Sequence, residues 1–378
     1  MMIMKNAMSL AAAAGAAIDT DTDSSSSMWV CGEVLIDRLP APISNNKEGN
    51  SNDNRINIVG GGAANTAKCI SRLGYKVEFI DGLSSDIYGQ MAVSDLLNDN
   101  VGLDLCLMTD SDKPTCLATV TLDQDTKKAS YEFLINNTST FAFHKSWLPD
   151  FAIHKPSVLH IGTLATIIEP GATEIYNWAY EGAVASCCHN NNNNNNIPIV
   201  YDPNIRPSVM PDRNKYQKSV NKFASISTII KASDDDIEWL YPNTSLEAVA
   251  RNWLFATDGD GDGEGLTSLV VITKGADGIM SFTKQNNNNN IKNNKNDMNI
   301  HIINVKPSIQ IVVKDTVGAG DTVGAILVEA VVKYGINKLV NNDHNCLLRS
   351  VLERANKASG ITCSREGCKP PTQADLLS

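Results

Sequence analysis

Short apolar segments alternate with segments of helix length over most of this chain, and this alternation limits the possible folds more than any other feature of the sequence. The apolar segments are rich in β-branched residues, which is typical of buried strands. A strand, a helix and a further strand in succession are typical of a parallel sheet with helices on its faces. We therefore expect an α/β fold with a largely parallel central sheet. The predicted strands span residues 28–36, 77–80, 158–161, 199–201, 226–231 and 269–273, and predicted helices span 63–73 and 88–97.

One stretch departs from this alternation. Residues 115–122 and 129–135 each alternate apolar and polar side chains, and the polar segment 123–128 joins them without room for a helix. Two such runs predict an antiparallel hairpin outside the parallel sheet. We expect this hairpin to form a lid.

The composition and charge of the chain limit its class. It has 378 residues, of which 42% are hydrophobic, so it can build one large or two medium domains with sizeable cores. The formal net charge of −10 opposes binding to nucleic acid or to an anionic membrane, although a local basic site for a small anion stays open. The sequence contains no apolar run of the roughly 18 residues that a membrane span needs. The nine cysteines are scattered without a C-x-x-C pair, which indicates a reducing, cytoplasmic location rather than a disulfide framework or a zinc module.

The first 27 residues do not resemble a folded segment. Residues 8–18 are apolar but rich in alanine, and an acidic, serine-rich stretch follows without a convincing cleavage site. We interpret residues 1–27 as a disordered tail, with organelle targeting as the alternative, and residues 28–378 as the folded domain. Asparagine-rich segments at 44–54, 189–196 and 285–296 interrupt this domain, and we expect surface loops there, with an interaction element as the alternative.

The segment 312–327 contains the residues best suited to chemistry. An apolar run leads into Gly318, Ala319 and Gly320, and a helix is predicted to begin at or near Asp321. Glycine-rich backbone at a helix N-terminus presents N–H groups and the positive end of the helix dipole, which together can hold a phosphate. A carboxylate beside a phosphate is repelled unless it has a task, and the natural task is to take the proton of an attacking hydroxyl. The alternative is purely structural, because aspartate is a common N-cap and glycine a common turn residue.

A second glycine-rich segment lies near the start of the domain. Gly60, Gly61 and a third glycine precede a predicted helix whose first turn contains Asn65. Glycines let the backbone approach a ligand, and an asparagine amide can both donate to and accept from a polyhydroxylated molecule. The segment is not a P-loop, because the sequence has no Gly-Lys-Ser/Thr, and it is not a dinucleotide fingerprint, because its third glycine has the wrong offset.

Together these two segments, GGGAAN at 60–65 and DTVGAGD at 315–321, resemble the two signatures of the PfkB, or ribokinase-like, family of carbohydrate kinases, and the resemblance covers about residues 29–377. It implies a three-layer αβα fold with a mostly parallel sheet and a small β-sheet lid, formed by residues 36–59 and 113–136. It also implies that Asp321 is the catalytic base and that Gly318, Ala319 and Gly320 form the anion hole for the γ-phosphate. The residues that it places at the sugar are Asp37, Gly60, Gly61 and Asn65. For Asp37 the alternative is a solvated carboxylate at a strand end.

The resemblance further implies a nucleotide site and two cation sites. Asp315, Arg365 and Gly367 match a loop for a monovalent cation such as K⁺. The Mg²⁺ site is expected at Asp236, where this chain has Ser233 and Asp236 in place of a common Asn-x-x-Glu. The implied cofactors are thus ATP, Mg²⁺ and K⁺, and a homodimer formed through the lid is one arrangement that the resemblance allows. The implied ATP-binding residues are Asn204, Thr273, Gly275, Gly278 and Asn356.

These observations predict an ATP-dependent kinase that transfers the γ-phosphate to a hydroxyl of a small sugar. The segments GEVLID at 32–37 and DPNIRP at 202–207 are most similar to those of fructokinases and 2-keto-3-deoxygluconate kinases, so fructose is the expected acceptor. Ribose, 2-keto-3-deoxygluconate or a nucleoside stay open as acceptors, as does a non-catalytic relative that keeps the fold as a binding or regulatory module. Residues 258–263 imitate the start of a calcium loop, but its twelfth position is Leu269 and an apolar strand follows, so we expect an acidic surface loop.

Overall fold

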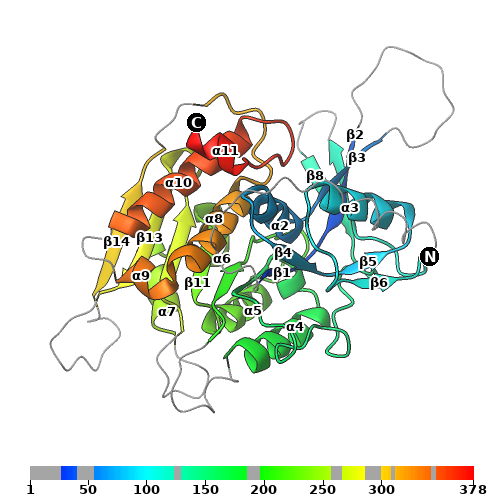
Figure 1. The fold of residues 1–378 in the computed structure, drawn as a ribbon, viewed down its shortest axis with the longest axis horizontal. Coiled ribbons are helices and arrows are strands. Elements are labelled where there is room, and N and C mark those ends of the chain that lie inside the picture. Colours follow the sequence, from blue (N-terminus) through cyan, green and yellow to red (C-terminus); the bar gives the residue numbers. More distant parts are fainter. Residues whose placement is uncertain are drawn as a thin grey trace.

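A computed structural model describes residues 27–40, 55–122, 129–184, 196–256, 266–285, 299–307, 311–341 and 346–378 of the chain (Figure 1). Residues 1–26, nearly all of the three asparagine-rich segments and the acidic segment 258–263 lie outside the described residues. Across the described ranges, no helix combines the length and the apolar character needed to cross a membrane.

An eight-stranded sheet, which we call the central sheet, runs through the middle of the molecule. Its strands follow the order β14, β13, β12, β11, β10, β9, β1, β4. Six of them pair in parallel, and the other two add an antiparallel edge, so the predicted mostly parallel α/β sheet is confirmed. The parallel strands are β1 (Met28–Cys31), β4 (Val77–Ile80), β9 (Val158–Gly162), β10 (Ile199–Asp202), β11 (Ile229–Ser233) and β12 (Leu269–Thr273), and the edge strands are β13 (Ile279–Lys284) and β14 (Ile300–Val305).

Side chains of the central sheet alternate between its two faces and form two separate cores. On β1, Met28 and Val30 belong to one core, and Trp29 and Cys31 belong to the other. All four side chains are buried. Burial on both faces explains why these strands are continuous apolar runs rather than alternating ones.

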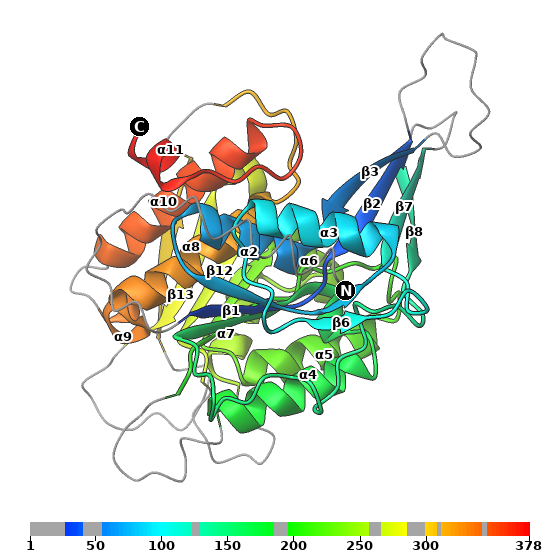
Figure 2. The same cartoon turned by 45° about the vertical axis from the view of Figure 1, so that its right-hand side comes forward.

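Helices cover both faces of the central sheet, as the two views show (Figures 1 and 2). This arrangement confirms the three-layer αβα fold. On the face of Met28 lie α2 (Gly62–Arg72), α3 (Ile87–Asn98), α8 (Ala319–Tyr334), α9 (Ile336–Val340), α10 (Cys346–Cys363) and α11 (Gln373–Leu377). On the face of Trp29 lie α4 (Gly171–Ala179), α5 (Arg213–Ser225), α6 (Asp234–Leu240) and α7 (Leu246–Leu254). Short turns of helix are η2 (Thr163–Thr166), η3 (Tyr180–Val184) and η5 (Gly275–Asp277).

A second sheet of four strands, which we call the lid sheet, projects from one end of the central sheet (Figure 2). It consists of β2 (Leu35–Pro40), β3 (Arg55–Gly60), β7 (Leu117–Leu122) and β8 (Ala129–Leu134), in the order β3, β2, β7, β8. β7 and β8 pair in antiparallel register, with Leu117 opposite Leu134, so the predicted hairpin is confirmed. A third, two-stranded sheet pairs β5 (Gly82–Ser84) with β6 (Leu107–Thr109).

The prediction of one strand over residues 28–36 is wrong. β1 ends at Cys31, and β2 begins at Leu35 in the lid sheet. α2 passes so close to the chain here that a Cβ atom on Gly32 would lie 2.5 Å from the Cβ atom of Ala63. Val34 N then donates to the Asp81 carboxylate at 2.8 Å instead of to a neighbouring strand. The break carries the chain from the central sheet into the lid sheet.

Candidate active site

A cavity of about 800 Å³ lies where the central sheet, the lid sheet and the first turn of α8 meet. Parallel strands end at one edge of a sheet, so the residues that follow β9, β10, β11 and β12 come together there. Most of the site residues predicted from the sequence line this cavity. They are Asp37, Gly61, Asn65, Asn204, Asp236, Thr273, Gly275, Asp315, Gly318, Gly320, Asp321 and Gly367.

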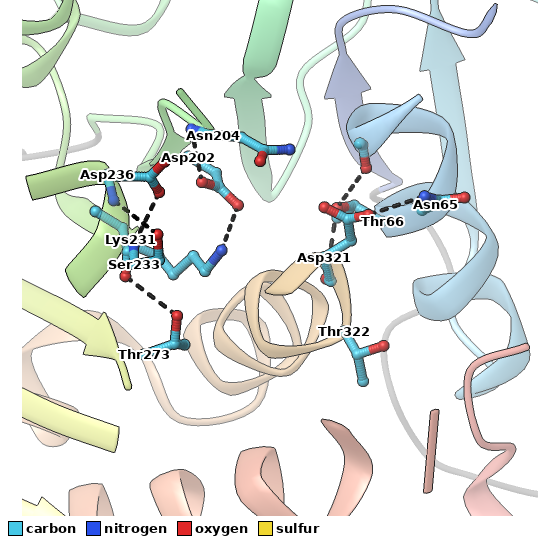
Figure 3. Close-up of polar contacts among 12 residues, drawn as sticks. Asn65, Thr66, Asp202, Asn204, Lys231, Ser233, Asp236, Thr273, Asp321 and Thr322 are labelled. Atoms are coloured by element: carbon cyan, nitrogen blue, oxygen red, sulfur yellow. Dashed lines mark hydrogen bonds and ion pairs between the residues drawn. The ribbon is translucent and has the colours of Figure 1, made fainter. Parts of the chain in front are cut away.

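Asp321 lies in the first turn of α8 and is only 7% exposed (Figure 3). Asn65 Nδ2 of α2 donates to its Oδ2 at 2.9 Å, so the two glycine-rich segments meet at this carboxylate. Burial, with the nearby Asp202 carboxylate, raises the pKa of Asp321 to about 6, while Lys231 and the Asn65 hydrogen bond oppose that rise. A carboxylate with such a pKa is ionised at neutral pH and is basic enough to accept a proton from a hydroxyl.

The glycines before Asp321 form the start of α8. Gly318 caps the helix with a left-handed φ of 77°, which glycine adopts without strain, and its Cα packs against the Cys368 thiol. A Cβ atom on Gly320 would lie 2.7 Å from Lys231 Nζ. The Ala319 N–H donates to the Thr316 carbonyl at 3.2 Å, so Ala319 does not offer a free donor to an anion. The first N–H groups of a helix otherwise lack a partner within the helix, so the N–H groups of Gly318 and Gly320 can still hold an anion. The helix begins at Ala319, two residues before the predicted start.

A buried ion pair, which was not predicted from the sequence, lies next to this turn. Lys231 Nζ of β11 lies 2.8 Å from Asp202 Oδ2 of β10, and the side chains are 5% and 2% exposed. Asp202 Oδ1 also accepts from Asn204 N at 3.1 Å and holds Asn204 at a positive φ of 39°. A lysine inside an otherwise apolar strand is rarely buried without a partner, and this was the available signal.

Asp37 and Arg206 line the part of the cavity nearest the lid sheet. Burial raises the pKa of Asp37 to about 6, and the Arg206 guanidinium opposes that rise. Gly60 packs directly on the Asp37 carboxylate, because a Cβ atom at Gly60 would overlap Asp37 Oδ2. Arg206 also lowers the pKa of Asp321, so its charge acts on both carboxylates. Arg206 lies in the segment DPNIRP at 202–207, but no role was predicted for it from the sequence.

The Ser233 and Asp236 element forms a capping box at the start of α6. Asp236 Oδ2 accepts from Ser233 N, and Oδ1 accepts from Ile205 N, each at 2.9 Å. Each oxygen keeps a further lone pair, and oxygen is the ligand that Mg²⁺ prefers. The residues therefore fit a Mg²⁺ ion that is held mainly by phosphate and water, with one carboxylate from the protein.

The predicted ATP-binding residues fall into two groups. Asn204, Thr273 and Gly275 line the cavity. Gly278 and Asn356 are not among the residues that line the cavity, and both lie against the end of β14. The carbonyl of Val305 accepts from Asn356 Nδ2 at 3.1 Å. The same carbonyl leaves no room for a Cβ atom on Gly278.

The predicted monovalent-cation loop is also only partly at the cavity. Asp315 accepts from Val317 N and from Gly367 N, each at 3.0 Å, and so joins the loop before α8 to the segment after α10. These oxygens suit a hard cation such as K⁺. Arg365 instead contacts Asp375 at 3.1 Å and donates to the carbonyl of Pro370, so it fixes the C-terminal segment.

Residues 26–375 match the family described as pfkB family carbohydrate kinase. The chain belongs to this family. A fructokinase from Rhizobium leguminosarum bv. trifolii is 31% identical over 295 residues, which cover 78% of this chain and 76% of the relative. Among pfkB-like solved structures, a fructokinase with bound ATP from Xylella fastidiosa has a TM-score of 0.73 at 20% identity and covers 93% of this chain and 97% of its own. A fructokinase double mutant from Vibrio cholerae O395, in a form with fructose, ADP and potassium ion bound, has a TM-score of 0.68 at 22% identity and covers 94% and 98%.

Proposed function

We propose that this protein is an ATP-dependent sugar kinase and that fructose is its acceptor. One observation carries the proposal. The Asp321 carboxylate lies where the sugar-side residues Asp37 and Asn65 and the glycine turn at 318–320 meet in one cavity. Phosphoryl transfer needs positioning and charge stabilisation more than covalent chemistry, and this arrangement supplies both.

In this proposal Asp321 acts as the general base. Asn65 donates to its Oδ2. A Cβ atom added to Gly62 would lie only 3.2 Å from Asp321 Oδ1, so the cavity is narrow where the reacting hydroxyl would bind. The hydroxyl gives its proton to this carboxylate as its oxygen bonds to the γ-phosphorus of ATP, and the bond from that phosphorus to the β-phosphate oxygen breaks so that ADP leaves. The N–H groups of Gly318 and Gly320, with the Lys231 ammonium next to Gly320, stabilise the charge on the phosphoryl group.

ATP, Mg²⁺ and K⁺ are the proposed cofactors. Mg²⁺ neutralises phosphate charge when bound, and the Asp236 carboxylate is the residue we assign to it. K⁺ would order the loop that Asp315 closes onto Gly367. The Xylella and Vibrio structures, which hold ATP in one case and fructose, ADP and potassium ion in the other, support the ATP and K⁺ of this set.

The choice of fructose rests on the fructokinase names of the relatives and on the polar residues of the sugar side. Asp37 can accept hydrogen bonds from two hydroxyls, and Arg206 can donate to a third.

We also propose that the protein works in the cytoplasm and that two copies associate through the lid sheet, which exposes Ile56, Ile58 and Leu134.

The decisive experiment uses γ-phosphate-labelled ATP with a panel of fructose, ribose, 2-keto-3-deoxygluconate and adenosine. We expect label transfer to fructose with the highest kcat/KM, and no transfer by Asp321→Asn under the same conditions. Transfer to another member of the panel would correct the acceptor. Binding of sugar and ATP without any transfer would instead favour a binding or regulatory module.

A further inference from the structure

Glu33 is a buried carboxylate in the break between β1 and β2, and no role was predicted for it from the sequence. It is 2% exposed and lines the cavity. Its Oε1 accepts from Gly62 N, at the start of α2, at 3.2 Å. Its Oε2 accepts from the Thr163 hydroxyl and from Ala165 N, both in the turn η2 that follows β9. One side chain thus joins two segments that are about a hundred residues apart in the sequence.

Thr163 has a backbone conformation that needs support. Its φ is 65°, in the left-handed region that β-branched residues rarely adopt, and it is 2% exposed. Such strain persists only where surrounding contacts fix it, and it concentrates at functional sites. The Thr163 hydroxyl donates to Glu33, so this contact is one that fixes it.

Gly62, which is held by its bond to Glu33, lies close to the proposed base. A Cβ atom on Gly62 would lie 2.5 Å from Thr163 Cγ2, 2.8 Å from Asn204 Nδ2 and 3.2 Å from Asp321 Oδ1. Gly62 therefore sits among groups from three other segments, and a small shift of its turn changes the space at Asp321. The same turn leads into Asn65, which holds the other oxygen of Asp321.

We propose that Glu33 is a positioning residue for the sugar site: by bonding Gly62 and Thr163 together, it fixes the glycine turn against Asp321. The inference rests on the proposed sugar kinase function. In this role Glu33 and Thr163 do not contact the sugar. They increase sugar affinity indirectly, by fixing Gly62 and Asn65.

The bonds to Glu33 depend on its ionised form. The N–H groups of Gly62 and Ala165 can only donate, and they face different oxygens of Glu33. A carboxylate accepts at both oxygens, whereas a protonated carboxyl must donate from one of them. Burial raises the pKa of Glu33 to about 7, and the bonds from Thr163, Ala165 and Gly62 partly oppose that rise. The titratable groups that face it are Cys31 of β1, Asp81 after β4, Cys116 before β7 and Tyr216 of α5. Acidification through this range should therefore weaken sugar binding.

The test measures sugar and ATP affinity in variants of the full-length protein. Glu33→Gln places an amide NH₂ group against a backbone N–H, of Gly62 or of Ala165, whichever way the amide turns. Thr163→Val removes the hydroxyl donor, whereas Thr163→Ser keeps it. We expect Glu33→Gln and Thr163→Val to raise the fructose KM about tenfold or more, as loss of a buried charged hydrogen bond does, with the ATP KM changed less than about twofold. Thr163→Ser should stay close to wild type. Glu78→Gln, at another buried carboxylate whose pKa burial raises but which is not among the cavity residues, is the matched control.

A second readout does not depend on turnover. Calorimetric binding of fructose without nucleotide should weaken in wild type as the pH falls from about 8 to about 7, and Glu33→Gln should show a smaller loss over the same range. At lower pH, protonation of Asp37 and Asp321 weakens binding in both proteins. An unchanged fructose affinity and pH profile in Glu33→Gln would overturn the proposal, as would equal losses in Thr163→Ser and Thr163→Val. If Glu33→Gln does not fold, the two Thr163 variants decide. If wild type binds fructose but transfers no phosphate, the proposed function fails while the role of Glu33 is still measured.

Discussion

Replacing Asp321 by asparagine should stabilise the protein while it abolishes most of its activity. The pKa of Asp321 rises from an ordinary value of 3.8 to about 6 in the folded state, mainly through burial. At about 1.4 kcal/mol per pKa unit, the ionised carboxylate costs the folded state about 3 kcal/mol. Asparagine cannot ionise, and its amide oxygen can still accept from Asn65. The variant should also lose the roughly 10²–10⁴-fold rate contribution of a general base.

The destabilisation caused by the ionised Asp321 carboxylate depends on pH. Below about pH 4 the carboxyl is protonated in both the folded and the unfolded chain, so the charge costs nothing. The cost grows as the pH rises and is complete above about pH 6. We therefore expect Asp321→Asn to unfold in urea with a free energy about 3 kcal/mol above that of wild type at pH 8, and with almost no difference near pH 4.

The assay pairs urea unfolding at both pH values with steady-state kinetics at pH 8. Asp110→Asn, at an exposed position, serves as the control and should change neither quantity. A variant that is inactive and also less stable at pH 8 would show that Asp321 is structural. A stability difference that is the same at both pH values would refute the assignment of the shift to a buried charge.

Three further perturbations test other parts of the site. Asp37→Ala should raise the fructose KM about tenfold or more and leave the ATP KM nearly unchanged, because each lost charge-assisted hydrogen bond is worth about 1.5–3 kcal/mol. An unaltered fructose KM in steady-state assays would contradict the role of Asp37 in sugar binding. Lys231→Met, made together with Asp202→Asn so that no unpaired charge is buried, should lower kcat about 10²-fold and move the acid limb of the rate profile to lower pH, because Asp202 raises the pKa of Asp321 more than Lys231 lowers it. A limb that moves to higher pH would contradict this balance of charges. Amides of β7 and β8 should exchange hydrogen faster than those of the central sheet without sugar and slow markedly with fructose bound, and equal exchange in both states would mean that the lid does not close.

The sequence predicted the layers of the fold because burial on two faces leaves a direct trace in it. Strands such as Leu269–Thr273 are continuous apolar runs, and such runs are recognisable from the order of the residues alone. The break at 32–34 left no such trace. It depends on the approach of Ala63 and on the Asp81 carboxylate, both of which come from later segments of the chain. Local pattern cannot foresee a strand that ends because of a distant neighbour.

The same distinction applies to the site. Asp321 and Asn65 were predicted because each sits in a compact motif with a recognisable turn. Lys231 and Asp202 were missed because their partnership joins two strands and appears only when β10 and β11 pair. Thr163 was missed because no sequence pattern marks a left-handed threonine. Its conformation follows from contacts that the whole fold provides.

The charges around the anion hole show why it is made of backbone rather than of basic side chains. A cluster of free cations beside Asp321 would hold its pKa low, and a weakly basic carboxylate takes a hydroxyl proton poorly. Here the nearest ammonium, Lys231, is paired with Asp202, whose own charge raises the pKa of Asp321. The N–H groups of Gly318 and Gly320 stabilise a phosphate without adding a full positive charge. The arrangement thus favours an anion at the turn and keeps the pKa of the neighbouring carboxylate near 6, which the transfer of a proton from a hydroxyl requires.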